Sequence, residues 1–129
     1  LGGNGVQMGI RFAASEESNA GPTLKEFYLK AKPEDVMLIN SPVGLPGQAV
    51  RNPFAAKIAD GTVAKPDSCD ACLKHCSQSF CIIKALIRAQ QGDVETGLVF
   101  TGENVHKIDK ILSVKEIIAT LVKEAEETE

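Results

Sequence analysis

The sequence predicts an α/β fold in which amphipathic helices outnumber short strands. Three segments carry apolar side chains at helical spacing, and they span residues 23–32, 80–91 and 114–125. Only two or three short strand-like segments accompany them, at residues 6–12, 36–39 and 98–100. These strands are too few to close a barrel or a doubly wound sheet. We therefore expect the helices to pack on one another, or the missing strands to come from another segment of chain.

Length and composition exclude several function classes. The chain has 129 residues, of which 43% are hydrophobic and 24% charged, as in one modest globular domain. The net charge is −3 and no basic run exceeds two residues, so we expect no nucleic-acid partner and no membrane partner. No apolar run approaches the roughly 20 residues that span a bilayer, and no signal-peptide pattern is present. The expected compartment is the cytoplasm.

The opening segment, residues 5–12, has the two-residue alternation of a strand. Four apolar residues face one way (Val6, Met8, Ile10 and Phe12), and the other face is less apolar (Gln7, Gly9 and Arg11). Gly9, near the end of this strand, indicates a place where the backbone passes close to another group. Because the strand begins almost at residue 1, we expect the chain to be the tail of a longer protein.

Local start and stop signals define the next elements. Ser15 is expected to begin a short helix, because Glu16 and Glu17 suit a first turn. Thr23 and Glu26 form a capping-box pattern for the helix that Pro33 closes.

The region after Pro33 reads as a strand, a loop and a short helix. The continuous apolar run from Val36 to Ile39 fits a buried strand. Residues 41–47 hold too many prolines and glycines for either regular element. Asn52 as the N-cap, Pro53 as the first helical residue and Gly61 as the stop predict a short helix over residues 53–60.

The second half of the chain is dominated by two helices. The first is predicted from about Phe80 to Gln91 and stops at Gly92, and residues 98–100 follow as a short extended segment. The second begins at the capping box formed by Ser113 and Glu116 and continues along an apolar stripe to residue 125.

All four cysteines lie within 13 residues, spaced Cys69-x2-Cys72-x3-Cys76-x4-Cys81. Four soft ligands at short spacing suit tetrahedral zinc or an iron–sulfur cluster, and His75 could replace one ligand of a zinc site. Buried thiols, disulfides and free redox-active thiols are the alternatives, and disulfides are rare in the cytosol. The spacing matches no standard zinc-ribbon or ferredoxin pattern, so these alternatives stay open.

The opening segment and the run Ser41-Pro42-Val43-Gly44-Leu45-Pro46-Gly47 together resemble the nitronate monooxygenase (2-nitropropane dioxygenase) family and the related flavin-type enoyl-acyl-carrier-protein reductases. The resemblance extends from residue 3 to about residue 123. It implies the C-terminal portion of a (β/α)8 FMN-binding barrel, with the last strand and closing helices, plus a small, mainly helical lid subdomain. The expected division is residues 1–32 for the barrel strand and following helices, 33–100 for the lid with the cysteines, and 101–129 for the return segment and last helix.

The resemblance also implies a cofactor site at the end of the opening strand. Gln7, Met8, Gly9 and Ile10 stand where the family binds the phosphate of FMN. Ile10 replaces the family's usual Thr, which removes a hydroxyl donor but keeps the backbone N–H. The alternative is an ordinary strand with a glycine bulge.

The resemblance places the catalytic base on an earlier barrel strand, which has no counterpart here, so no catalytic residue is assigned. His106 has no acid or nucleophile near it in sequence and reads as structural or exposed. The implied activity is oxidation of alkyl nitronates with O2, or reduction of an enoyl thioester by the same fold. The expected partners are the remainder of the barrel, a small-molecule substrate and a second copy of the protein in a homo-oligomer. A different class of function, a stand-alone cysteine-rich metal or interaction module, stays open.

Overall fold

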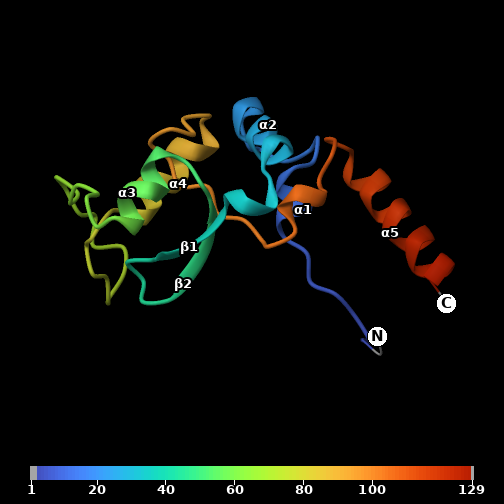
Figure 1. Cartoon of the computed structure of the whole chain (residues 1–129), viewed down its shortest axis with the longest axis horizontal. Coiled ribbons are helices and arrows are strands. Elements are labelled where there is room, and N and C mark those ends of the chain that lie inside the picture. The colour runs from blue at the N-terminus through green and yellow to red at the C-terminus, as the bar shows by residue number, and fades with distance from the viewer. Residues whose placement is uncertain (1–2, 129) are drawn as a thin grey trace.

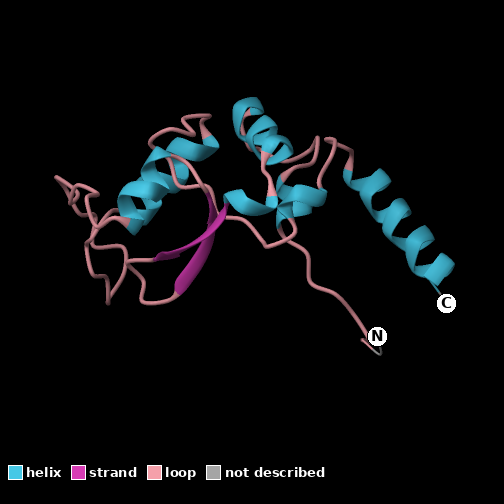
Figure 2. Cartoon of the chain, in the orientation of Figure 1, coloured by secondary structure: helices cyan, strands magenta, loops and turns pink. Residues whose placement is uncertain are grey.

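The structure, a computed structural model, describes residues 3–128, which contain five α-helices, two 3-10 helices and two strands (Figures 1 and 2). Residues 1, 2 and 129, at the outer bounds of the first and last expected regions, lie outside the described residues. In chain order the elements are α1 (Ile10–Ala13), α2 (Pro22–Lys30), η1 (Pro33–Asp35), β1 (Val36–Asn40), β2 (Pro46–Val50), α3 (Pro53–Ala59), α4 (Ile82–Gln90), η2 (Val105–Lys107) and α5 (Val114–Thr128). The strands, α3 and α4 lie at one end of the molecule, α1 and α2 in the middle, and α5 at the other end (Figure 1).

The two strands form an antiparallel hairpin. Val36 pairs with Val50, and the register continues to Asn40 opposite Pro46. This confirms the predicted strand at 36–39, but the expectation that it is buried is wrong, because Ile39 alone is buried and Leu38 is 69% exposed. The prediction that residues 41–47 join no strand is wrong at its end, because Pro46 and Gly47 begin β2. Proline is tolerated there because it is the first residue of its strand.

The far edge of β2 receives the extended segment that follows α4. Val50 N–H donates to the Val99 carbonyl at 2.9 Å, and Ala49 forms an antiparallel bridge with Phe100. The predicted extended segment at 98–100 is thus confirmed, and it is held in place by β2. Gly47 is needed here for space, because a Cβ at this position would lie 2.5 Å from Cε1 of the Phe100 ring.

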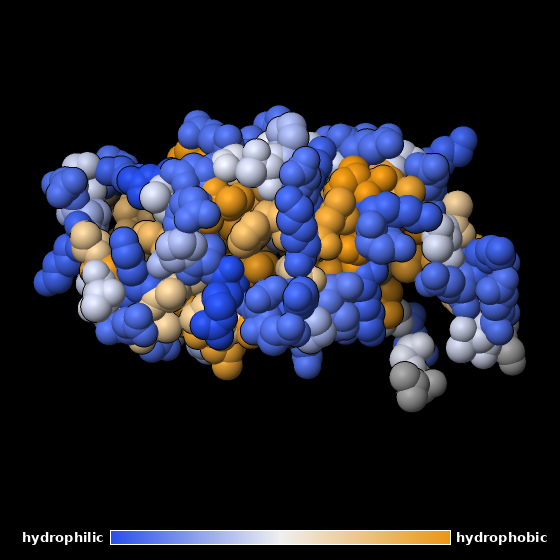
Figure 3. Space-filling model, turned by 45° about the horizontal axis from the view of Figure 1, so that its top comes forward, coloured by the Kyte–Doolittle hydropathy of each residue, from blue (hydrophilic) through white to orange (hydrophobic). Residues whose placement is uncertain are grey.

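Two hydrophobic clusters hold the molecule together. One lies in the hairpin end and consists of Ile39, Ala49, Ala55, Phe80, Ala85 and Leu98. The other lies in the middle and consists of Ala14, Leu24, Tyr28, Ala31, Val50, Ala89, Val99, Val105 and Ile108. α5 has only Ile117 buried, while Ile118 and Val122 are about half exposed at 50% and 51%. Figure 3 shows apolar surface in two areas of one face, separated by a column of hydrophilic side chains.

The predicted helix caps at α3 and α5 are confirmed. The Asn52 side chain accepts a hydrogen bond from Ala55 N–H at 2.7 Å, and Pro53 is the first helical residue. Ser113 N–H donates to the Glu116 carboxylate at 3.0 Å while Glu116 N–H donates to the Ser113 hydroxyl at 3.3 Å. A second carboxylate, that of Glu17, accepts from Val114 N–H at 2.9 Å. Carboxylates suit the positive end of the α5 dipole.

The predictions for the first 23 residues are largely wrong. Residues 3–9 form no strand, and Ile10–Ala13 is the short helix α1. A barrel strand needs neighbours on both edges to pair its backbone, and the described residues supply none here, so Val6 is left 88% exposed. No helix begins at Ser15, whose hydroxyl instead donates to the Phe12 carbonyl at 2.8 Å. The capping box at Thr23 is also wrong, because α2 begins at Pro22 after Gly21.

Candidate functional site

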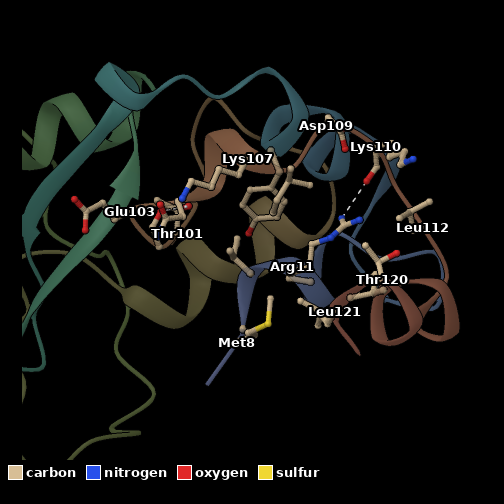
Figure 4. A pocket seen from close by; sticks show the side chains of 18 of the residues that line it. Met8, Arg11, Thr101, Glu103, Lys107, Asp109, Lys110, Leu112, Thr120 and Leu121 are labelled. Carbon is tan, nitrogen blue, oxygen red and sulfur yellow. Dashed lines mark hydrogen bonds between the residues drawn. The ribbon is translucent and has the colours of Figure 1, made fainter. Parts of the chain in front are cut away.

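The four predicted cofactor residues lie together on the wall of a hollow of about 1120 Å³ (Figure 4). Gln7, Met8, Gly9 and Ile10 form one side of it. The return segment after Phe100 and the inner face of α5, with Ile117 and Leu121, form the others. The hollow thus lies where the start of the chain meets its end, and its walls come from segments about 100 residues apart in sequence.

The backbone at the hollow has free hydrogen-bond donors. Phe12 and Ala13 N–H both donate to the Gly9 carbonyl, whereas among residues 3–128 the N–H groups of Gly9, Ile10 and Arg11 donate to no protein acceptor. A Cβ at Gly9 would meet no atom within 4 Å, so this position is open on the hollow side. Free N–H groups beside an open backbone position can receive an anion such as a phosphate.

Charged side chains of both signs also line the hollow. Arg11 lies beside the free N–H groups, and its guanidinium donates to the Lys110 carbonyl at 3.0 Å (Figure 4). Lys107 and Lys110 line the hollow from the return segment, as do Glu103 and Asp109. Sequence reasoning missed the lysines, because nothing in the sequence links residues 107–110 to residues 7–11. Arg11 could have been found, since it directly follows the predicted cofactor residues.

Tyr28 forms part of the floor of the hollow. It projects from α2, is 6% exposed, and its hydroxyl donates to the Phe100 carbonyl at 3.3 Å. Burial disfavours the phenolate and raises the pKa of Tyr28 to about 12. The contact therefore ties α2 to the return segment through a group that stays neutral across the physiological pH range.

Tyr28 gives the chain an alkaline stability limit. The folded pKa lies above the unfolded value, so the stabilisation is complete below about pH 10 and is lost as the pH rises toward 12, at a total cost of about 2–3 kcal/mol. Tyr28 is the one tyrosine of the chain and there is no tryptophan, so the ultraviolet absorbance of phenolate reports it alone. We expect a titration midpoint near 12 in the folded protein and near 10 in urea. Equal midpoints in the two states would contradict this assignment, and Tyr28→Phe, which lacks the ionisable group, is the control.

The four cysteines line a second, smaller hollow of about 160 Å³. All four are free thiols; Cys69 and Cys72 are exposed, and Cys76 and Cys81 are half-buried. Residues 3–128 contain no group of three or more His, Cys, Asp or Glu side chains placed to hold a metal ion, so the sulfurs do not converge on one point as a zinc site requires. His75 is exposed and does not line this hollow, and His106 is exposed on η2.

No helix within residues 3–128 is both long enough and apolar enough to cross a membrane.

Comparisons with known proteins agree on one family. The family described as nitronate monooxygenase matches residues 1–124. A probable nitronate monooxygenase of Staphylococcus saprophyticus is 34% identical over 67 residues, which cover 52% of this chain and 19% of that relative.

Solved structures match more of the chain. The structure of FabK from Thermotoga maritima is 35% identical with a TM-score of 0.77, and the match covers 95% of this chain and 37% of that one. The M276A mutant of that protein is 34% identical with a TM-score of 0.73, covering 98% and 35%. The chain thus spans just over a third of the length of these structures. Because the family match extends over nearly all of its residues, the chain belongs to the nitronate monooxygenase family.

Proposed function

We propose that this chain is the C-terminal part of an FMN-dependent oxidoreductase that oxidises alkyl nitronates with O2. The observation that carries the proposal is the hollow lined by Gln7–Ile10, where the backbone N–H groups of Gly9 and Ile10 have no protein acceptor and Arg11 follows in the chain. A phosphate monoester needs such donors and a nearby cation. The family match over residues 1–124 supports the same cofactor.

In this proposal the chain binds and orients the flavin. Backbone N–H groups of Gly9 and Ile10 hold the phosphate, and Arg11 compensates its charge from the adjoining position. Ile10 contributes no hydroxyl, so backbone donors carry the contact. When bound, FMN supplies the redox chemistry, and the base that activates the substrate comes from the barrel outside this chain.

The rest of the protein follows from the length of the relatives. Because the chain spans 35–37% of the FabK structures, we propose that the remainder of a (β/α)8 barrel completes the site and covers α5 and the opening segment. We propose residues 33–100 as the lid, in keeping with a hydrophobic cluster drawn wholly from that range. The cytoplasm, where thiols stay reduced, suits the four free cysteines.

A second candidate is enoyl-acyl-carrier-protein reduction on the same fold. It is favoured by the FabK structures, which match nearly the whole chain, whereas the nitronate relative matches 52% of it. Assays of the parent protein with an alkyl nitronate and O2, and with an enoyl thioester and reduced nicotinamide, separate the two. Turnover of the nitronate alone supports the proposal, and turnover of the thioester alone replaces it with the second candidate.

Gly9→Val tests the phosphate cradle. Within this chain the valine Cβ meets no atom within 4 Å, and its methyl groups would occupy the space that a phosphate needs. In the parent protein we expect FMN affinity, measured by flavin fluorescence, to fall at least about tenfold, or about 1.4 kcal/mol. Gly5→Val is the matched control, because Gly5 is equally open but does not line the hollow. Equal FMN affinities in the two folded variants would contradict the proposal that the backbone at Gly9 and Ile10 binds the FMN phosphate.

A further inference from the structure

The cysteine segment is a long stretch of chain without regular structure. Residues 62–81 contain no helix or strand, and loops of that length in compact proteins are usually functional or disordered. Both ends are fastened: Phe80 is 2% exposed in the hairpin-end cluster, and the Lys84 ammonium donates to the Ser68 carbonyl at 3.1 Å and hydroxyl at 2.6 Å. The middle has little to bury, since its one large aliphatic side chain, Leu73, is 41% exposed.

The four cysteines line a space that is larger than one ion. Tetrahedral zinc with bonds of about 2.3 Å would bring its sulfurs to within about 4 Å of one another. No such group exists among residues 3–128. Yet all four cysteines line the same hollow of about 160 Å³, which is several times the volume of a water molecule. Thiols spread around one hollow suit a multi-atom group with a separate attachment point for each sulfur.

The backbone around this hollow is unusual. Among residues 3–128, Ala71 and Gln78 are the non-glycine residues with positive φ, at 50° and 56°. Both line the hollow, one between Cys69 and Cys72 and the other between Cys76 and Cys81. Left-handed residues turn neighbouring N–H groups to the same side, and such concavities hold anions, including iron–sulfur clusters.

Hydrogen bonds already reach two of the sulfurs. Gln78 donates to Cys76 Sγ from its backbone N–H at 3.4 Å, and to Cys69 Sγ from its side-chain amide at 3.8 Å. Donors of this kind stabilise thiolates and are a feature of iron–sulfur ligation. A single residue in a left-handed conformation therefore contacts one sulfur from each half of the motif.

We infer that Cys69, Cys72, Cys76 and Cys81 ligate a [4Fe–4S] cluster, independently of the flavin site. Each cysteine gives one thiolate to one iron, and its proton passes to solvent on binding. Four attachment points on one compact group account for four thiols around one hollow without convergence on a single point. The bound cluster orders residues 66–81, which have few apolar contacts of their own.

The test is anaerobic reconstitution of the complete chain with equal amounts of ferrous and ferric iron and with sulfide, which supply the two ferrous and two ferric equivalents of the cluster, followed by desalting and assay of iron and acid-labile sulfide. We expect about four of each per chain, and background amounts in the variant with all four cysteines changed to serine. Ser77→Ala, in the same loop but at a position that does not line the hollow, is the matched control and should retain the full content. Limited proteolysis gives a second readout: cleavage within residues 66–81 should slow on reconstitution, while cleavage in α5 stays unchanged.

Three results would contradict the assignment of the four cysteines as cluster ligands. They are equal iron and sulfide retention by the serine variant, tight binding of one zinc per chain with no retained sulfide, and two disulfides found by mass in the anaerobically purified protein. Because iron and sulfide are measured directly, failure of FMN binding leaves this result unaffected.

Discussion

The 129-residue chain alone is expected to give no flavin-dependent turnover of alkyl nitronates or enoyl thioesters above that of free FMN. The described residues contain one hairpin and no barrel, and the chain spans just over a third of the FabK structures. Positioning of reacting groups is worth up to about 7–11 kcal/mol in enzymes, and in the proposed function the groups opposite the phosphate come from the barrel outside this chain. The expected loss relative to the parent protein is about 10⁵-fold or more.

The measurement compares the chain alone, the parent protein, and the chain mixed with the segment of the parent that precedes it. Oxygen consumption with an alkyl nitronate and oxidation of reduced nicotinamide with an enoyl thioester are followed in each. Recovery of activity in the mixture would show that the missing barrel supplies the absent groups. Turnover by the chain alone at a rate comparable to the parent would contradict both this prediction and the assignment of the base to the barrel.

Elements with strong local signals were predictable from sequence. Asn52 and Pro53 fix the start of α3, and Ser113 with Glu116 fixes the start of α5, because these caps act within one turn of the helix. Of the two strands of the hairpin, only the first was predicted. Its first strand is a continuous apolar run, whereas its second begins with Pro46 and Gly47 and is defined by its partners rather than by its composition.

The opening segment shows where local patterns fail. Alternation at residues 5–12 is a property of the sequence, but a strand also needs neighbouring backbone, and that information lies outside these residues. Without a pairing edge, the chain turns into the short helix α1, in which Phe12 and Ala13 N–H donate to the Gly9 carbonyl and Ala14 N–H donates to the Ile10 carbonyl. The mismatch between pattern and structure is itself consistent with a segment whose partners belong to the rest of a barrel.

Some residues of the candidate site could likewise be predicted from sequence, and others could not. Residues 7–10 could be found because a short motif carries them. The lysines at 107 and 110 come from the return segment, and only the fold brings them beside the opening segment. The cysteine spacing indicated a shared site, but it could not distinguish four thiols on one ion from four thiols around a hollow.

Gly97→Ala is expected to destabilise the chain by at least about 3 kcal/mol. Gly97 is buried where the segment after α4 folds back across the helix. An added Cβ would lie 2.5 Å from the backbone nitrogen of Ala89 and 2.7 Å from its Cα. These are atoms of a helix backbone, so they cannot rotate away as a side chain would. The carbonyl of Gly97 also accepts from the Asn52 side chain at 2.8 Å, so any shift weakens the start of α3.

Gly102→Ala is the matched control for this substitution. Its Cβ would meet no atom within 4 Å, and its φ is not in the left-handed range, so the loss of unfolded-state entropy makes it neutral or stabilising by up to about 1 kcal/mol. Urea denaturation of both variants measures the difference in the free energy of unfolding. Opposite signs are expected, because one methyl group enters the backbone of α4 and the other enters open space. Equal urea midpoints for the two variants would mean that the segment after α4 does not pack against Ala89. They would then also contradict the position of Phe100 at the edge of β2, because Phe100 belongs to the same segment.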